Sequence, residues 1–210
     1  MPRNVRPLDR PTVVRDASLI VVACEDTHAV KQYFGKVQPR RLQFRVLATD
    51  DGRSSPADVL IRLDEYCNEF QVGEGDQLWL CIDTDHWVKA GHIPTLVETL
   101  RLCKQKRYRV AMSHPCFELW LLLHFADLIP DESLNCREII SQLRQAAGSY
   151  QKDKVSQLPI EAEKVLQAVS RAKALEALDE AAAYSIPGSP ATRVYLLVEE
   201  LIKRESIRLG

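Results

Sequence analysis

The sequence lacks several patterns that would assign it to a familiar class of protein. Its apolar runs stay well below the ~20 residues that span a bilayer. Its N-terminus lacks the order of basic, apolar and small residues that marks a signal peptide. We therefore expect a cytoplasmic protein. Its net charge of −1 favours neither a nucleic acid nor another charged partner, so any basic surface must be local.

Cysteine frameworks and nucleotide-binding motifs are missing as well. The six cysteines have no CxxC or paired spacing and mostly lie in apolar segments, which is typical of reduced cysteines in a core. No GxxxxGK[ST] motif is present, so we do not expect the chain to hydrolyse ATP by itself. The segment CEDTHAV after the first apolar run has no glycine to let a dinucleotide approach the backbone.

The first half of the chain alternates between strand and helix patterns. Strand patterns cover 18–24, 42–48, 76–83 and 108–113, and helical periodicity covers 27–36, 56–70 and 93–106. This order predicts an α/β fold with a four-stranded parallel sheet, flanked by helices and joined by right-handed crossovers. Thr27 and Ser55 stand where helix N-caps are expected.

The second half shows helical patterns only. We therefore expect an α/β core at 18–113 and a C-terminal helical extension at 114–210 that packs on it. Residues 1–17 contain three prolines and several charges without apolar periodicity, which indicates a flexible N-terminal arm. The apolar segment 115–127 predicts a buried helix, with His124 as a core histidine.

Acidic residues follow two of the predicted strands. Glu25 comes after the first strand, and Asp83 and Asp85 end the third in LWLCIDTDHW. Ligands of open parallel sheets bind at the carboxyl ends of the strands, so these carboxylates meet if the two strands are neighbours. If the third strand continues to residue 85, the two aspartates also point to the same side. Such oxygen ligands suit Mg²⁺ or Mn²⁺, although an acid after a strand is often only a helix cap.

Glu118 is the one acid in the apolar segment FELWLLLHF. An acid in the first turn of a helix interacts favourably with the helix dipole, and this structural role is one interpretation. The segment also begins where the fourth predicted strand ends, so Glu118 is expected near the edge that carries the other acids. There it would support the metal ion or the substrate.

Four segments together resemble the RloB-like family, whose core is related to the Toprim fold. They are LIVVACEDTHAVKQYF, LWLCIDTDHW, VAMSHPCFELWLLLHF and SPATRVYLLVEELI, and they extend from about residue 18 to 203. The first acid of the family pattern falls on Glu25, its aspartate pair on Asp83 and Asp85, and its helix acid on Glu118.

The chain departs from the family pattern at three positions near these acids. Asp26 stands where the family usually has glycine, His28 stands where a second glutamate region begins, and His114 stands where asparagine is usual. Asp26 adds negative charge beside the acids and makes the backbone of the loop less adaptable.

The resemblance implies a nuclease-like effector of prokaryotic anti-phage defence that acts with an ATPase partner. It implies cleavage of phosphodiester bonds in DNA or RNA, tRNA included, by one or two Mg²⁺ or Mn²⁺ ions that the carboxylates hold. Glu25 is the candidate acid–base group, because it approaches the ion from a different loop than the aspartates. The alternative is a non-catalytic module that uses the same fold to dock on the ATPase.

Cations are needed to bind the phosphates of such a substrate. The candidates are Arg53, Lys89, Lys152 and Lys154, which lie in the predicted loops. Each of these side chains is more often a solvated surface charge.

Overall fold

The computed structural model describes residues 18–37, 42–49, 52–88, 91–129, 131, 133–176 and 182–204. The predicted N-terminal arm and Lys89 lie outside these residues. No helix in the described part of the chain is long and apolar enough to cross a membrane.

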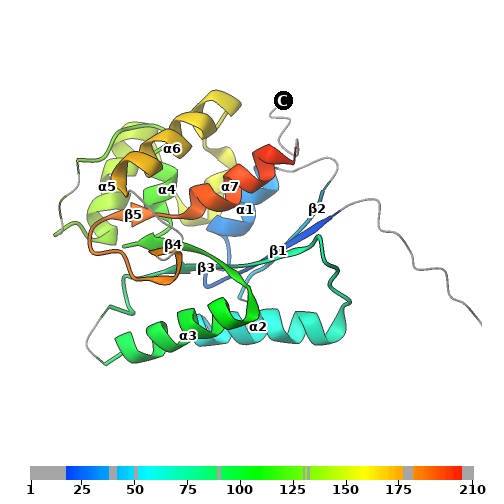
Figure 1. The fold of residues 1–210 in the computed structure, drawn as a ribbon. Helices are drawn as coiled ribbons and strands as arrows, with labels where there is room; N and C mark the ends of the chain where they lie inside the picture. The colour runs from blue at the N-terminus through cyan, green and yellow to red at the C-terminus, as the bar shows by residue number, and fades with distance from the viewer. Residues whose placement is uncertain are drawn as a thin grey trace, which may run out of the picture.

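Five strands form one sheet in the order β2-β1-β3-β4-β5 (Figure 1). They are β1 Leu19–Cys24, β2 Gln43–Leu47, β3 Gln77–Asp83, β4 Arg109–His114 and β5 Ala191–Thr192. The first four are parallel, and β5 is antiparallel to β4. The predicted α/β class and four parallel strands are therefore confirmed. The fifth strand was not predicted, because two residues are too few to show a strand period.

Helices cover both faces of the sheet (Figure 1). The α-helices are α1 Ala29–Lys36, α2 Pro56–Glu69, α3 Ile93–Lys106, α4 Glu118–Leu122, α5 Cys136–Ala147, α6 Ala162–Leu175 and α7 Val194–Lys203. Two short 3₁₀ helices are η1 Lys152–Gln157 and η2 Ala182–Tyr184. The layer of α2 and α3 covers one face, and the helices of the C-terminal half cover the other together with α1.

The strand β1 lies at the centre of the core because both of its faces are apolar. All six of its residues are buried. Ile20 and Val22 point into the cluster with α1 and the C-terminal helices, whereas Val21 and Ala23 point into the cluster with α2 and α3. This alternation is the two-residue period of a strand that is covered on both faces.

The predicted boundary at residue 113 stays a prediction. The C-terminal half adds β5 to the edge of the sheet, and α7 and α6 share one hydrophobic cluster with β1 and α1.

The N-cap prediction was right for α2 and wrong for α1. The Ser55 side chain accepts from the Asp58 N–H, and the Asp58 side chain accepts from the Ser55 N–H in return, which forms a capping box. At α1 the N-cap position is His28, whose side chain makes no capping bond. Asp26 supplies that bond instead, because its Oδ1 accepts from the N–H groups of His28 and Ala29.

The buried helix predicted over 115–127 is shorter than expected, since α4 has only five residues. After Leu122 the chain turns with three-residue bonds, from the His124 N–H to Leu121 O and from the Phe125 N–H to Leu122 O. The prediction for His124 is confirmed, because it is 1% exposed. Its Nδ1 lies 2.9 Å from Trp120 O and its Nε2 lies 3.2 Å from Tyr33 Oη.

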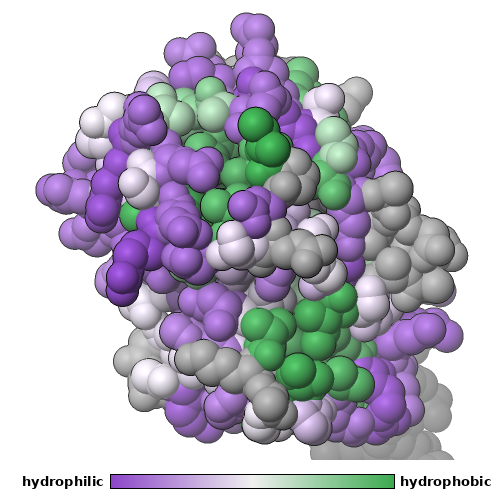
Figure 2. Space-filling view, turned by 90° about the vertical axis from the view of Figure 1, so that its left-hand side faces the viewer, coloured by the Kyte–Doolittle hydropathy of each residue, from purple (hydrophilic) through white to green (hydrophobic). Residues whose placement is uncertain are grey.

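Hydrophobic side chains also remain exposed on the layer of α2 and α3. They include Ile61, Ile93 and Val97, of which Val97 is 51% exposed. A groove between the two helices has a volume of about 640 Å³. Figure 2 shows hydrophobic residues gathered in the lower half of its view, where this layer lies.

Candidate functional site

The acids after β1 and β3 meet because these two strands are neighbours in the sheet. Cys24, the last residue of β1, pairs with Cys81 of β3. Glu25 therefore lies beside the end of β3, and its Oε1 accepts from the Asp83 N–H over 3.3 Å. The carboxyl edge of the sheet thus brings Glu25 and Asp83 together as predicted.

The turn from Asp83 to Asp85 is fixed by the residues that follow β4. The Thr84 N–H donates to Ser113 O and Pro115 O, and the Asp85 N–H donates to Pro115 O over 3.0 Å. Since β3 ends at Asp83, the strand does not continue to Asp85. The expectation that strand alternation aligns the two aspartates is therefore wrong, and this hydrogen-bonded turn places Asp85 instead.

Thr84 makes a further bond that ties this turn to β4. Its side chain is fully buried, and its Oγ1 lies 2.5 Å from Nδ1 of His114. Burial lowers the pKa of His114 below its ordinary value, which favours the neutral imidazole.

Two of these acids accept hydrogen bonds from residues outside the predicted set. Trp87 Nε1 donates to Glu25 Oε2 over 3.2 Å, and Cys136 Sγ donates to Asp85 Oδ2 over 3.3 Å. The side chain of Asp85 also faces His86, at 3.4 Å between Oδ2 and Nε2.

Glu118 is 3% exposed and accepts a 2.8 Å hydrogen bond at Oε1 from the hydroxyl of Tyr150. Its charge raises the pKa of Asp83, which places Glu118 beside the other acids.

The four acids Glu25, Asp83, Asp85 and Glu118 are called the acid cluster below. Burial raises the pKa of Glu25 to about 8, and the charge of Asp85 contributes to this rise. Burial, followed by the charges of Glu25, Glu118 and Asp85, raises the pKa of Asp83 well above its ordinary value. The cluster thus holds more negative charge than its buried surroundings stabilise, which favours protonation or a bound cation.

Lys152 is a predicted cation that lies close enough to the acid cluster to interact with its charges. It lies in η1, and its Nζ is 2.7 Å from Oδ2 of Asp26. Burial lowers its pKa, but the Asp26 carboxylate and the charges of Glu118 and Asp83 outweigh this effect, so the pKa of Lys152 is raised. The ammonium therefore stays charged beside the cluster.

The other predicted cations have different surroundings. Arg53 is exposed in the loop before α2, and its backbone carbonyl accepts from Thr49 Oγ1 and from Arg62. Lys154 is exposed in η1 and lines a small cavity of about 120 Å³ next to Tyr150. Lys89 lies outside the described residues.

A divalent cation fits the acid cluster by the chemistry of its donors. All four are carboxylates, which Mg²⁺ and Mn²⁺ prefer, and their mutual repulsion is what such an ion relieves. Among the residues that the structure describes, no three histidine, cysteine, aspartate or glutamate side chains are arranged as the ligands of a metal ion. Several carboxylate oxygens face Trp87, Cys136 and Tyr150 instead.

Most of the residues that hold the acids in place could not be predicted from the sequence. Trp87 follows the DTDH segment directly, so its nearness to the site was readable from the sequence. Tyr150 and Cys136 reach the acid cluster from segments more than 30 positions away from their partners. Their contacts depend on how the C-terminal half packs on the sheet, and no local pattern announces them.

The chain belongs to the RloB-like protein family, whose model matches residues 20–201. This match confirms the resemblance seen in the sequence and covers both the sheet and the C-terminal helices. Neither a curated protein nor a solved structure matches the chain.

Proposed function

We propose that this protein is a metal-dependent nuclease that cleaves phosphodiester bonds in DNA or RNA and acts with an ATPase in anti-phage defence. The observation that carries the proposal is the acid cluster, because four acids from β1, β3 and α4 converge at the carboxyl edge of the sheet. Membership of the RloB-like family supports it.

Metal binding is the first task that the proposal assigns to the cluster. Glu25, Asp83 and Asp85 would hold Mg²⁺ or Mn²⁺, and the ion supplies polarisation of the phosphate and a lowered pKa of a bound water. The hydrogen bonds to Pro115 O fix the turn from Asp83 to Asp85, and therefore the positions of the two aspartates relative to each other. Such preorganisation reduces the cost of gathering like charges around one ion.

Phosphate recognition and proton transfer complete the reaction. The Lys152 ammonium, which lies beside the cluster, would neutralise a non-bridging phosphate oxygen. The oxygen of a water molecule forms a bond to phosphorus while the bond from phosphorus to the leaving sugar oxygen breaks, and the leaving oxygen takes up a proton from solvent. Glu25 accepts the proton of the water, because it reaches the site from a different loop than the aspartates. Arg53, Lys89 and Lys154 would contact phosphates farther along the strand.

Glu118 has a supporting role in this proposal. Its buried carboxylate is held by Tyr150 and lies beside Asp83. It would raise the negative potential that attracts the ion and keep the Asp83 side chain oriented, without accepting a proton itself.

A cleavage assay tests the proposed function. The purified protein is incubated with pools of DNA and RNA, tRNA included, with Mg²⁺ or Mn²⁺, alone and with a candidate partner ATPase. We expect cutting that requires the metal and that Asp83→Asn/Asp85→Asn abolishes. Stable binding of the ATPase without cutting under any condition would instead establish a non-catalytic docking module.

Calorimetry tests metal binding apart from cleavage. Mg²⁺ and Mn²⁺ are titrated into the parent protein and into Asp83→Asn/Asp85→Asn, and we expect the affinity to fall in the variant. Equal affinity in the two proteins would rule out these aspartates as ligands.

A further inference from the structure

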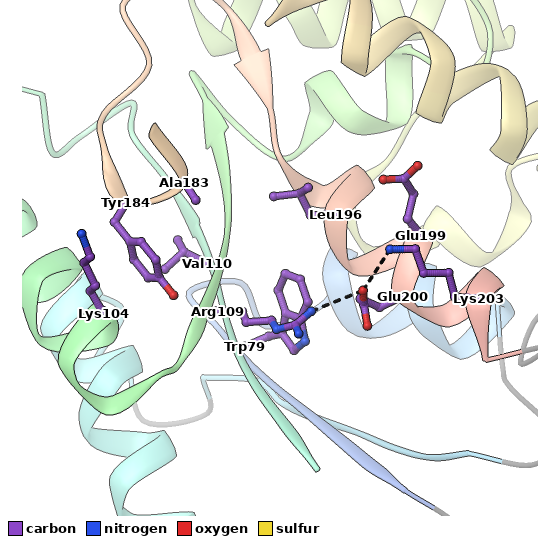
Figure 3. Close-up of a pocket in the computed structure, with 10 residues that line it drawn as sticks. All are labelled: Trp79, Lys104, Arg109, Val110, Ala183, Tyr184, Leu196, Glu199, Glu200 and Lys203. Carbon is purple, nitrogen blue, oxygen red and sulfur yellow. Dashed lines mark hydrogen bonds and ion pairs between the residues drawn. The ribbon is translucent and has the colours of Figure 1, made fainter. Parts of the chain in front are cut away.

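A cavity of about 760 Å³ lies beside the first half of β4, between η2 and α7 (Figure 3). Its lining residues include Trp79, Val110, Tyr184 and Leu196, which give it an apolar floor and walls. None of the four acids of the acid cluster lines it. The cavity is thus separate from the proposed nuclease site, and its volume lies in the range of ~300–1,000 Å³ that ligand sites occupy.

The cavity lies where the sheet has an open edge. β5 pairs only with Ser113 and His114, so it covers the end of β4 and leaves the earlier residues of β4 without a neighbouring strand on that side. The backbone groups of successive strand residues point alternately to the two sides. Ser113 O points toward β3, where it accepts from the Thr84 N–H, so Met112 and Val110 point toward the open edge.

Hydrogen bonds to backbone carbonyls close the edge at both ends and leave its middle open. At one end, the Arg193 N–H donates to Met112 O over 2.8 Å. At the other end, the Tyr184 hydroxyl donates to Tyr108 O over 3.1 Å. Between them lies Val110, and no hydrogen bond from the described residues reaches its N–H or its carbonyl on this side. Both groups face the space of the cavity.

The rim of the cavity carries more cations than acids. Arg109 and Lys203 share one carboxylate, that of Glu200, at 3.4 and 3.3 Å (Figure 3). Arg109 also lies over the ring of Trp79, with 5.4 Å from its guanidinium carbon to the ring centroid.

The other charged residues at the rim do not offset this excess of positive charge. Glu199 is paired with Lys173 at 2.6 Å. Lys104, an exposed residue in the last turn of α3, has no ion-pair partner among the described residues. An acidic ligand is therefore favoured by the charge of this rim.

We propose that this cavity binds an extended acidic peptide segment of a partner protein, which adds to the sheet beside Val110. A peptide backbone offers an acceptor and a donor to the N–H and the carbonyl of one strand residue, as in β-strand addition. A small anion matches only the N–H, since the carbonyl repels it. An apolar side chain of the peptide enters toward Leu196 and Trp79 on the side of α7, and the acidic side chains next to it point to the other face of the sheet, toward Lys104 of α3. Lys203 adds positive charge at the rim.

Two peptides of opposite charge test the proposal. One is the acetylated and amidated pentapeptide Asp-Val-Asp-Val-Asp, and the other is Lys-Val-Lys-Val-Lys with the same ends. Binding is measured by calorimetry at low ionic strength, and protection of the Val110 amide is measured by hydrogen exchange. We expect the acidic peptide to bind, to protect the Val110 N–H and to bind at least roughly tenfold more tightly than the basic one.

Charge-reversal variants test the rim. Lys104→Glu and Lys203→Glu should each weaken the acidic peptide about tenfold, whereas Lys31→Glu, on exposed α1 surface, should leave its affinity unchanged. All three positions are exposed, and a thermal melt confirms that each variant folds.

Four results would overturn the proposal. They are the absence of binding by the acidic peptide, equal binding of both peptides, binding that leaves the Val110 amide unprotected, and full competition by inorganic phosphate, which would make the cavity a simple anion site. Self-association of the protein with protection of Val110 in the absence of peptide would assign the edge to a second copy of this chain. These results are independent of whether the protein cuts nucleic acid.

Discussion

Lys152 and Asp26 form an ion pair of 2.7 Å that joins η1 to the loop after β1. Asp26 also accepts from the first N–H groups of α1, so one carboxylate fixes both the start of that helix and the position of the lysine. The pair therefore holds a cation beside the acid cluster.

Removing the charge of Lys152 should affect metal binding and cleavage in opposite directions. In Lys152→Met the competing cation is gone, so we expect Mn²⁺ to bind about two- to fivefold more tightly. The rate of cleavage at saturating Mn²⁺ should fall, because the phosphate loses its neutralising partner. Calorimetry and a cleavage assay measure the two effects.

Two control variants are needed to interpret the result for Lys152→Met. Lys152→Arg keeps the charge and should retain the metal affinity of the parent, and Lys31→Met removes an exposed charge from α1 and should change neither property. A lower metal affinity in Lys152→Met would show that the lysine only stabilises the local fold.

Glu118→Gln separates a structural from a functional role of this acid. The helix α4 has only five residues, so its dipole gives the carboxylate little stabilisation, and glutamine retains an acceptor for the Tyr150 hydroxyl. We therefore expect the free energy of unfolding to change by less than about 1 kcal/mol while the rate of cleavage falls. Urea unfolding and a cleavage assay are measured side by side.

Tyr150→Phe is the matched control for that variant, because it removes the hydrogen bond that Glu118→Gln retains and keeps the charge of Glu118. It should lower the rate less than Glu118→Gln does. If Glu118→Gln instead lowers stability and leaves the rate at that of the parent, Glu118 is a structural residue.

The stability of the fold should depend on pH through His124. Burial lowers the pKa of His124 from 6.5 to about 4, while its ordinary value applies in the unfolded chain. Below pH 6.5 the unfolded chain therefore binds a proton that the folded protein does not, and stability is lost as the pH falls toward 4. The fall of the pKa of His124 from 6.5 to about 4 corresponds to a loss of roughly 3 kcal/mol in the free energy of unfolding once the pH is below 4.

The effect of His124 must be isolated from that of Glu25. The raised pKa of Glu25, about 8, makes the folded protein bind the extra proton, which contributes stability at low pH that is lost as the pH rises toward 8. We therefore compare the parent with His124→Phe by urea unfolding from pH 7 to 4.5. The difference between the two free energies of unfolding should shift by roughly 2–3 kcal/mol over this range, and a constant difference would contradict the prediction.

The strands and the acids at their ends could be read from the sequence, because both depend on local order. The run LIVVAC is apolar at every position, which marks a strand covered on both faces, and Glu25 follows it directly. Once β1 and β3 are neighbours, the meeting of Glu25 with Asp83 follows from the parallel direction of the strands.

Contacts from distant segments could not be read in this way. The turn that places Asp85 depends on the carbonyl of Pro115, and the carboxylate of Glu118 depends on Tyr150. Both partners come from parts of the chain whose own patterns indicate only helix or loop. The capping residue of α1 could not be predicted either. Asp26 and Thr27 are both good capping residues, and only the conformation of the loop decides which of them caps the helix.

The division of labour between Glu25 and the aspartates predicts which variants excess metal rescues. Asp83→Ala and Asp85→Ala each remove a ligand, so raising the concentration of Mn²⁺ should restore part of the rate. Glu25→Gln keeps an oxygen for the ion and an acceptor for the Trp87 N–H, but it cannot take up a proton. Because general acid–base catalysis typically contributes 10²–10⁴-fold, a loss of about that size should persist at every Mn²⁺ concentration.

The measurement is a titration of the cleavage rate with Mn²⁺ for the three variants, with circular dichroism to confirm folding. Rescue of Glu25→Gln without rescue of either aspartate variant would reverse the assignment and make Glu25 mainly a ligand.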